Sequence, residues 1–432
     1  MSTPRNRTIK VDYMARVEGE GALYVKMKGE RVEDVQLKIF EPPRLFEAFL
    51  RGRTFSEAPD ITARICGICP IAYQMSAIHA MERALGIDVH PMVRLLRRLF
   101  YCGEWIESHG LHVFLLHAPD FLGYPDAIAL ARDHKETVEM GLRLKKAGNQ
   151  IVTLLGGREI HPVSAAVGGF HRVPSRAELE PLREELKWAL DASIATAKLV
   201  STFECITFEP DYEFVALRHP TEYPLNEGRI VSNRGLDISA DEYEDHFQER
   251  HVKHSNALHS YHRGFGSYLV GPLSRFNLNF DKLPEIAQQV ARDCRLTPPV
   301  RNPFRSIGVR AVELVFACHE ALRILDAYEP PPEPRVKVRP RSAIGRAATE
   351  APRGILYHRY ELDEHGLIVT AKIVPPTSQN QPRIEDDLRE LMPGLVAESD
   401  AEITLRAEQA VRNYDPCISC ATHFLKLNLD RT

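Results

Sequence analysis

The sequence predicts an α+β protein that is mainly helical, with a central bundle of long helices between an N-terminal antiparallel β-meander and a C-terminal β-hairpin. Three observations predict this class. Apolar and polar residues alternate near both ends of the chain, as they do in strands that are buried on one face. Between these ends, apolar residues recur every three or four positions over long runs, which is typical of amphipathic helices. No internal repeat or low-complexity segment interrupts the pattern.

The first half of the chain is predicted to contain the meander and most of the helical bundle. Residues 8–40 alternate in character, and glycines mark the turns between the expected strands. Pro42-Pro43 then opens a short amphipathic helix. Residues 59–205 form the helical core, in which the strongest helical patterns cover residues 61–85, 91–117, 137–155 and 177–203. Pro70 is expected either to kink the first of these helices or to start it again.

The second half of the chain is predicted to be mixed. Residues 207–345 combine short β-like runs with two further helical patterns, at residues 283–294 and 308–328. The proline-rich run at residues 329–334 is expected to form a stiff link across the surface rather than a domain boundary. Residues 346–423 are expected to contain the hairpin, at 357–374, and then two helices and a terminal cysteine motif. Together these features predict a single domain over residues 1–423.

The charge balance and the N-terminus narrow the class of protein. The 432 residues include 55 Lys and Arg against 59 Asp and Glu, so neither nucleic acid nor an anionic membrane is predicted as the main partner. No stretch of about 18 apolar residues exists, which predicts no membrane span. The polar N-terminus predicts no signal peptide, and we therefore expect a cytoplasmic location. The basic cluster Arg94, Arg97 and Arg98 is interpreted as a solvated helix face.

Two C-x-x-C pairs, one near each end of the chain, are the main candidates for chemistry. They are Cys66 with Cys69 and Cys417 with Cys420. Positions i and i+3 of a helix lie on one side, so each pair is predicted to present both sulfurs together from a helical turn. Asp415 suits an N-cap and Pro416 suits the first helical position, which would place the second pair in a first turn. Four thiolates from the two ends predict a soft-metal site.

The spacing alone leaves the metal open between a structural zinc ion and a redox metal. Zinc ribbons separate their cysteine pairs by about 15–20 residues, far less than the separation here. A helix N-terminus would lower the pKa of the Cys417 and Cys420 thiols. A structural zinc ion with four sulfur ligands would have no use for His423, which lies three residues after Cys420.

The remaining cysteines and a run of histidines are predicted to be structural. Apolar helical contexts surround the other four cysteines, which we expect in the core: Cys102, Cys205, Cys294 and Cys318. Four histidines follow one another without acidic or thiolate company in the sequence: His251, His254, His259 and His262. A polar interface is favoured over a metal site for this run.

The longer motifs around the cysteine pairs resemble the signatures of the large subunit of nickel–iron hydrogenases. These motifs are Arg64-Ile65-Cys66-Gly67-Ile68-Cys69-Pro70 and Asp415-Pro416-Cys417-Ile418-Ser419-Cys420-Ala421-Thr422-His423. Intermediate motifs follow in the family's order: Arg16-Val17-Glu18-Gly19, Arg44-Leu45-Phe46-Glu47, Leu116-His117-Ala118-Pro119-Asp120, Glu350-Ala351-Pro352-Arg353-Gly354 and Val374-Pro375-Pro376-Thr377-Ser378-Gln379-Asn380. The details are most similar to the cytoplasmic, NAD(P)-linked branch, which includes the sulfhydrogenase alpha subunits.

The resemblance implies the nickel–iron hydrogenase large-subunit fold and a nickel ion held by all four cysteines. Cys69 and Cys420 would bridge to an iron that carries two cyanides and one carbon monoxide. Cys66 and Cys417 would be terminal ligands, and Cys417 would accept the proton when H2 splits. The thiolates suit this chemistry because soft ligands stabilise a redox-active soft metal.

The resemblance also assigns residues around the metal. Arg353, beside Pro352, would stand over the centre and bind one cyanide, and Thr377 would donate to the other. Asp120 and Asp415 would orient Arg353. Without the resemblance, Arg353 would be read as a surface salt bridge, Thr377 as a turn hydroxyl and Asp415 as an N-cap.

Two further roles rest on the resemblance. Glu18 would take the proton from the terminal thiolate, although a Glu in a meander is usually solvated. Glu47, His423 and a backbone carbonyl near Ile373 would hold a second cation, magnesium or iron. Taken alone, Glu47 is the polar side of an amphipathic helix. The chain also departs from many members, which have His where it has Glu20 and Tyr73, and this affects the surroundings of the metal rather than its ligands.

The partners follow from the resemblance and from what the sequence lacks. Apart from the two pairs, the sequence has neither a cysteine cluster for an iron–sulfur centre nor a dinucleotide-binding G-x-G-x-x-G motif, and no flavin is expected in this chain. An iron–sulfur small subunit and flavin/NAD(P) diaphorase-type subunits would therefore carry the electrons. A maturation endopeptidase would remove a propeptide, residues 424–432, after His423. The alternatives are a complex I-like quinone-site subunit, which would lack the paired cysteines, and a structural-zinc scaffold.

Overall fold

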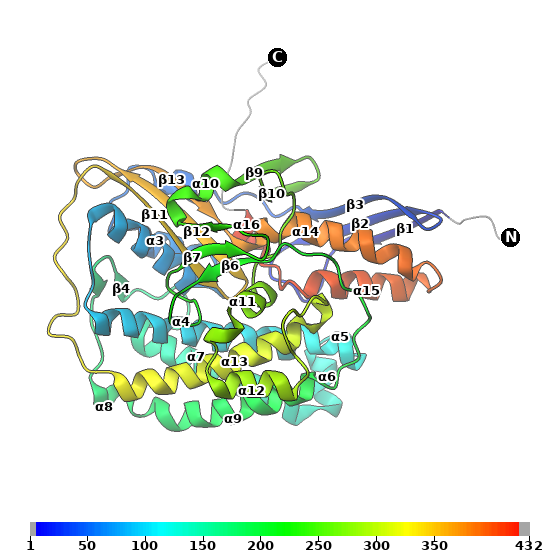
Figure 1. Cartoon of the computed structure of the whole chain (residues 1–432), viewed down its shortest axis with the longest axis horizontal. Coiled ribbons are helices and arrows are strands. Elements are labelled where there is room, and N and C mark those ends of the chain that lie inside the picture. Colours follow the sequence, from blue (N-terminus) through cyan, green and yellow to red (C-terminus); the bar gives the residue numbers. More distant parts are fainter. Residues whose placement is uncertain (1–5, 423–432) are drawn as a thin grey trace, which may run out of the picture.

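The computed structural model describes residues 6–422 and has a layer of long helices below a layer of sheets and shorter helices (Figure 1). Four long helices form the lower layer: α4 (Pro91–Leu111), α7 (Lys135–Gly156), α9 (Leu182–Val200) and α13 (Ser306–Ala327). Helices α4 and α13 are buried on almost every side, as expected for the centre of a bundle. The predicted helical bundle is confirmed.

The upper layer contains two three-stranded antiparallel sheets. The predicted meander consists of β1 (Asn6–Val11), β2 (Gly21–Lys28) and β3 (Arg31–Ile39). The second sheet consists of β11 (Ala343–Ala351), β12 (Gly354–Leu362) and β13 (Ile368–Val374).

The predicted C-terminal hairpin corresponds to β12 and β13, but the prediction missed β11. Its sequence is rich in small residues and lacks the β-branched pattern that indicates a strand. The small residues allow close packing on α3 (Pro70–Leu85), because a Cβ on Gly345 would lie 1.9 Å from the carbonyl oxygen of Ala80.

Shorter elements complete the fold. The other helices are α1 (Phe46–Leu50), α2 (Ala58–Thr62), α5 (Ala118–Leu122), α6 (Ala127–Asp133), α8 (Arg176–Leu179), α10 (Tyr243–His246), α11 (Pro272–Asn279), α12 (Glu285–Asp293), α14 (Pro376–Leu391), α15 (Asp400–Arg412) and α16 (Ile418–Ala421). The other strands are β4 (Ala165–Ala166), β5 (Gly169–Phe170), β6 (Val215–Arg218), β7 (Arg229–Ser232), β8 (Asp237–Ile238), β9 (Phe247–Val252) and β10 (Ser255–His262). Over residues 6–422, no helix has the length and apolar character needed to cross a membrane.

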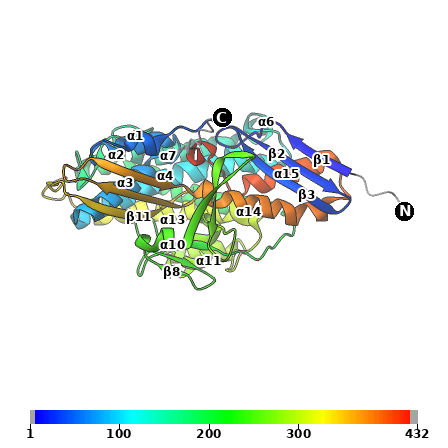
Figure 2. The ribbon, with the colours of Figure 1, turned by 90° about the horizontal axis from the view of Figure 1, so that it is seen from above.

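The two sheets leave a central position that the last helix occupies. Figures 1 and 2 show β1–β3 and β11–β13 toward opposite ends of the upper layer, with the short α16 between them. Helix α16 therefore meets the loop after β1 and the loop before α3 in the middle of the molecule. This arrangement brings Glu18 and the first cysteine pair next to the C-terminal cysteine pair.

The basic cluster in α4 is not the solvated face that the sequence indicated. Arg97 forms a two-pronged ion pair with Glu82, and Arg98 pairs with Glu320, with both guanidinium groups buried. The acidic partners lie on other helices, so their positions could not be read from local periodicity.

Candidate active site

The sulfur atoms of the two C-x-x-C pairs converge in the interior. One ligand atom from each of Cys66, Cys69, Cys417 and Cys420 lies within 4.8 Å of the others, and all four residues are buried. The Sγ atoms of Cys66 and Cys417 are 3.4 Å apart, and those of Cys69 and Cys420 are 3.6 Å apart. A metal bound at about 2.3 Å from each sulfur in a tetrahedron would place neighbouring sulfurs roughly 3.8 Å apart, so the cluster has the size of a metal site.

The prediction that the first pair shares a helical turn is wrong. Cys66 has an extended backbone after a short 3₁₀ helix (Ala63–Ile65), and Cys69 is the N-cap of α3, which starts at Pro70. The intervening loop instead folds around a sulfur, because the N–H groups of Ile68 and Cys69 donate to Cys66 Sγ at 3.3 and 3.2 Å. These amides stabilise a thiolate.

The second pair also differs from its prediction. Helix α16 begins at Ile418, with Cys417 as its N-cap, so Asp415 is neither a cap nor the start of a helix. Asp415 adopts a left-handed backbone with φ of 52°, a conformation that Asp tolerates better than most residues. Its carboxylate is directed to Arg353 instead of to the helix amides.

The ionisation of the four thiols indicates a site that suits a metal cation. Burial opposes ionisation of Cys66, but hydrogen bonds with the other three thiols and the charge of Arg353 lower its pKa well below the usual value. Burial, together with hydrogen bonds to the other three thiols, raises the pKa of Cys417 well above the usual value. The four sulfurs therefore share protons, and a soft metal ion fits this donor set because it would replace those protons.

Arg353 is the buried cation beside the thiols, which rules out the surface salt bridge. Its Nε donates to the backbone oxygen of Asp415 at 2.6 Å, and its Nη2 donates to Asp415 Oδ1 at 3.0 Å. Burial alone would lower the pKa of Arg353, but Asp415 and the neighbouring thiols raise it well above the usual value. The buried Nη1 has no partner among residues 6–422, so both of its N–H groups remain for a ligand.

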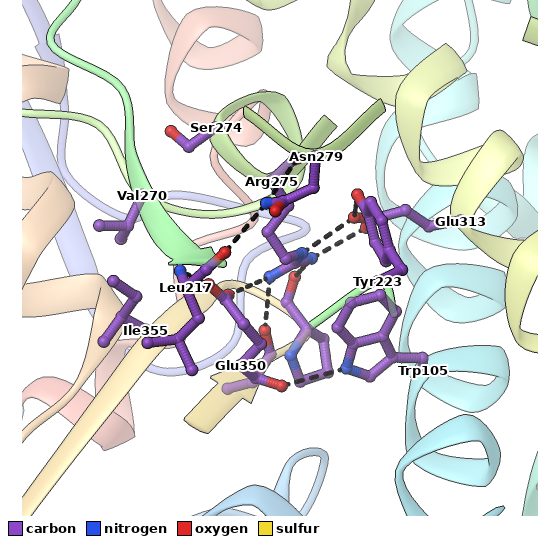
Figure 3. A network of polar contacts seen from close by, with 12 residues as sticks. Trp105, Leu217, Tyr223, Val270, Ser274, Arg275, Asn279, Glu313, Glu350 and Ile355 are labelled. Atoms are coloured by element: carbon purple, nitrogen blue, oxygen red, sulfur yellow. Dashed lines mark hydrogen bonds and ion pairs between the residues drawn. The ribbon is translucent and has the colours of Figure 1, made fainter. Parts of the chain in front are cut away.

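A buried network holds the turn that carries Arg353 (Figure 3). Arg275 Nη2 donates to the carbonyl of Pro352 at 2.7 Å. The same guanidinium is paired with Glu313 at 2.8 Å and with Glu350 at 2.9 Å. The sequence did not indicate Arg275, because its partners come from distant segments and no motif marks it.

Glu18 contacts the C-terminal loop through its side chain and its backbone. Its Oε2 accepts from Cys417 Sγ at 3.0 Å and from the N–H of Ser419 at 3.0 Å. Its backbone oxygen accepts from the N–H of Ile418 at 2.9 Å. The contact requires Gly19, whose φ is +90° and whose added Cβ would lie 2.7 Å from Ile418 Cβ.

Arg44 connects the two cysteine loops directly. One guanidinium nitrogen, Nη2, donates to the carbonyl of Ile65 at 2.6 Å and also to the carbonyl of Ser419. These carbonyls immediately precede Cys66 and Cys420 in the chain. The sequence marked Arg44 only as the first residue of a motif and not as the tie between the loops.

Asp120 does not contact Arg353, and the prediction that it orients this residue is wrong in that respect. Its carboxylate accepts from Arg412 at 2.7 and 2.8 Å and also pairs with Arg16. Arg412 is the last residue of α15, just before the terminal motif. Asp120 therefore anchors the backbone on both sides of the site rather than the arginine within it.

The remaining predicted residues lie around the cluster or outside the described chain. Buried Thr377 accepts the N–H of Cys417 at 3.1 Å, so it is not an ordinary turn hydroxyl. Glu47 Oε1 accepts the N–H of Ile373 at 2.8 Å, so two of the three residues expected around a second cation are in contact. The third, His423, lies outside the described residues, as does the expected propeptide at 424–432.

The two departures from the family pattern have different surroundings. Glu20 is exposed. Tyr73 is buried, and burial together with the nearby thiols of Cys420 and Cys69 raises the pKa of its hydroxyl well above the usual value, so this hydroxyl stays protonated.

Glu104 is a neighbour of the site that the sequence did not indicate. From α4 it accepts the first amides of α3, including the N–H of Ile71 at 2.7 Å. A Glu next to Trp105 within a helical pattern gives no sign of this role.

Two residues of the histidine run have carboxylate partners, which the sequence did not indicate. His254 Nε2 lies 2.7 Å from Glu385 Oε1, and His262 Nδ1 lies 2.9 Å from Glu213 Oε1. Both carboxylates come from segments remote in the sequence. Cys102, Cys294 and Cys318 are buried as predicted, and Cys205 is half-buried.

Comparisons with known proteins agree with this geometry. The family model for nickel-dependent hydrogenases matches residues 44–141 and 326–423. The sulfhydrogenase 1 alpha subunit of Pyrococcus furiosus is 33% identical over 97% of this chain and 98% of its own length. The sulfhydrogenase 2 alpha subunit of the same organism is 35% identical over 97% of this chain and 100% of its own length.

Solved structures share the fold over nearly the whole chain. The H2-reduced structure of an NAD+-reducing [NiFe]-hydrogenase matches with a TM-score of 0.87 and 26% identity, covering 96% of this chain and 99% of that one. A [NiFeSe]-hydrogenase of Dm. baculatum, at 21% identity, has the same fold with a TM-score of 0.79 over 97% of this chain and 100% of that one. The chain therefore belongs to the nickel-dependent hydrogenase family. It is a catalytic large subunit, an oxidoreductase acting on H2, and falls in the branch of the sulfhydrogenase alpha subunits.

Proposed function

We propose that the four cysteines hold a nickel–iron centre, with Cys66 and Cys417 as terminal ligands of nickel and Cys69 and Cys420 shared with iron. The observation that carries the metal centre is the convergence of four buried sulfurs from the two cysteine pairs. The division into terminal and shared ligands rests on the family resemblance. When bound, such a centre supplies the heterolytic cleavage of H2 into protons and electrons.

Glu18 is the proposed exit for the proton. Cys417 Sγ donates to Glu18 Oε2 at 3.0 Å, so a proton held on this sulfur has a carboxylate within hydrogen-bond reach. Glu18 is only half-buried, whereas Cys417 is fully buried, so the transfer moves the proton outward.

Arg353 and Thr377 are the proposed donors to the two cyanides, on an iron that also carries one carbon monoxide. Arg353 has a buried Nη1 without a partner among residues 6–422, and Pro352 is held beside it by Arg275. Thr377 Oγ1 accepts from the Cys417 amide, which leaves the hydroxyl proton for another acceptor. Asp415 orients Arg353, and a positioned guanidinium stabilises charge that develops in the site.

A second cation and a maturation step complete the proposal. Glu47, the carbonyl of Ile373 and His423 would bind magnesium or iron, supported by the contact between the first two residues. Residues 424–432 would be removed after His423 once nickel is loaded. Mass spectrometry of the active protein should find His423 as its last residue, whereas an intact Thr432 in active enzyme would contradict the cleavage.

We further infer that electrons leave through an iron–sulfur small subunit and then flavin/NAD(P)-type subunits. The names of the relatives support this, because they are alpha subunits of sulfhydrogenases and part of an NAD+-reducing hydrogenase. None of the eight cysteines forms a disulfide, which suits a reducing compartment such as the cytoplasm.

Isotope exchange tests the proposed function without needing the natural electron acceptor. The purified protein with its co-purifying subunits is incubated under D2 in ordinary water, and the gas is analysed for HD and H2. We expect rapid formation of both gases, and their loss in Cys417→Ser. No exchange by protein with a full nickel content would contradict the proposal.

A further inference from the structure

A second group of metal-binding side chains lies outside the four-cysteine cluster. His254, in the turn between β9 and β10, His259, in β10, and Glu385, in α14, each offer a ligand atom, and these atoms lie within 4.8 Å of one another. His254 Nε2 and Glu385 Oε1 are 2.7 Å apart. The three residues come from three separate segments, so the fold rather than a local motif brings them together.

His259 has an unused ring nitrogen in the interior. The residue is 1% exposed, and its Nε2 has no hydrogen-bond partner within residues 6–422. A break in the β9–β10 register between Ser255 and His259 interrupts the alternation of β10 just before this residue. A buried imidazole nitrogen without a partner destabilises the fold unless something binds to it. Imidazole nitrogens are common ligands of metal ions, so a metal ion could fill this place.

Glu385 is held in place by groups outside the cluster. Its Oε1 accepts the N–H of Leu37 in β3 at 2.9 Å. Arg389 approaches Oε2 at 3.4 Å, but its Nη1 also binds Asp386 at 2.8 Å, so its charge is shared between two carboxylates. Carboxylates that bind metals are commonly oriented by such hydrogen bonds.

Another group of similar composition shows what distinguishes this one. His219, Glu222 and Glu227 also lie within reach of one another, but Arg94 binds Glu227 at 2.6 Å and Glu222 at 2.5 Å. An arginine therefore already occupies the position of a cation there. The group around His259 instead has a spare buried nitrogen and a carboxylate fixed by backbone.

We propose that His254, His259 and Glu385 bind a zinc ion at a site separate from the four-cysteine centre. Two imidazoles and one carboxylate are a common zinc ligand set, and a water molecule can complete the tetrahedron. The ion would tie β10 to α14, the helix that also carries Thr377. We assign the ion to the support of β10 and α14 and not to H2 chemistry, because its ligands are separate from the four sulfurs.

The test is a zinc titration of the purified hydrogenase complex with its four-cysteine centre already loaded. X-ray absorption at the zinc edge then identifies the ligands, because zinc lies about 2.0–2.1 Å from nitrogen or oxygen and about 2.3 Å from sulfur. We expect one tightly bound zinc per chain with only nitrogen and oxygen ligands. Zinc bound only through sulfur, or no tight binding, would overturn the proposal.

Three variants locate the ion. His259→Gln and Glu385→Gln should bind zinc at least tenfold more weakly than the parent, whereas His262→Gln should bind it equally well. His262 is the matched control because it lies on the same strand and pairs with Glu213 instead. Equal affinity in all four proteins would overturn the assignment.

H2 uptake in each variant reports folding independently of zinc binding. If a buried substitution prevents folding, His254→Gln replaces it, since the His254 side chain is 21% exposed. Parent protein that binds zinc at this site but lacks H2 uptake would contradict the proposed function while leaving the zinc site intact.

Discussion

The two cysteine loops reach the same site by different means. The N-terminal loop is supported locally: α3 starts directly after Cys69, and amides of the loop itself donate to Cys66 Sγ. Glu104, on the neighbouring helix α4, accepts the first amides of α3. This loop thus belongs to the packed helical core.

The C-terminal loop is supported mainly by residues that are remote from it in the sequence. Helix α16 spans only Ile418–Ala421, too short to be stable alone. Its cysteines are held by Glu18, Thr377 and the Arg353–Asp415 pair, which come from remote segments. One half of the site is thus built into the helical core, and the other half is docked onto it.

The largest expected effect is the loss of a ligand from the docked loop. Cys417→Ser should abolish H2 uptake and leave the chain without nickel, because a serine hydroxyl is a poor ligand for a soft metal. The measurement is nickel content together with H2-dependent dye reduction. Cys205→Ser is the control, because this thiol meets only backbone carbonyls, and it should remain active. Retained uptake in Cys417→Ser would refute the ligand assignment.

Next in size is Arg353→Lys, which removes the planar group that joins the docked loop to β12. The rate of D2 exchange should fall by about 10²- to 10³-fold while nickel remains bound. Lysine has a single nitrogen, whereas Arg353 binds Asp415 through Nε and Nη2 and presents a separate Nη1 to the site. Arg359→Lys, on the same sheet and paired with the partly exposed Glu244, is the matched control. A loss of nickel in Arg353→Lys would instead make its role structural.

Glu18→Gln tests the proton path without removing the hydrogen-bond geometry. A glutamine can still accept from the Ser419 amide, but it cannot take a proton from Cys417, so H2 uptake should fall by about 10²-fold. Glu20→Gln, two residues further and exposed, should keep the parent rate. Equal rates for the two variants would show that the proton leaves by another route.

Acid stability tests the support behind Arg353. Burial alone would raise the pKa of Glu313, but its pairing with Arg275 lowers it from 4.5 to about 2. Because the folded-state pKa is depressed, the pairing stabilises the fold above pH 4.5, and this contribution is lost as the pH falls toward 2. It amounts to about 3 kcal/mol.

Glu313→Gln should therefore lower the free energy of unfolding at pH 7. This free energy should also fall less steeply between pH 7 and pH 3 than it does in the parent. Urea unfolding between pH 3 and pH 7 measures both changes. Glu364→Gln, in an exposed turn, is the control that should follow the parent. If the free energy of unfolding of the variant depends on pH as it does in the parent, the Glu313–Arg275 pair does not contribute to acid stability.

The smallest effect is expected from removing the Arg44 side chain, which connects the two cysteine loops. Arg44→Met should destabilise the protein by about 2 kcal/mol, because two charge-assisted hydrogen bonds to carbonyls are lost. Urea unfolding of Arg44→Met against Arg51→Met, an exposed neighbour, measures the difference. No difference between the two would mean that the loops dock without this contact.

The sequence predicted the features that depend on local pattern. Alternation identified β1–β3, helical periodicity identified the bundle, and the paired cysteines identified the metal cluster. The resemblance to a family then pointed to Glu18, Arg353, Thr377 and Asp415, which the structure places around the four sulfurs.

Features that depend on long-range pairing could not be predicted. Strand β11 is made of small residues that pack on α3, so it lacks a strand signal. The i,i+3 spacing suggested helical cysteines, but hydrogen bonds to sulfur and the Arg353–Asp415 pair favour loops instead. Asp120 binds Arg412 across the core, a partner that no local pattern marks.

The central claim is that the core loop and the docked loop close on one nickel–iron centre. It is tested most directly by elemental analysis and infrared spectroscopy of the purified, active complex. We expect one nickel per chain, together with infrared bands from cyanide and carbon monoxide on iron. Zinc bound by the four sulfurs, with no such bands, would contradict it.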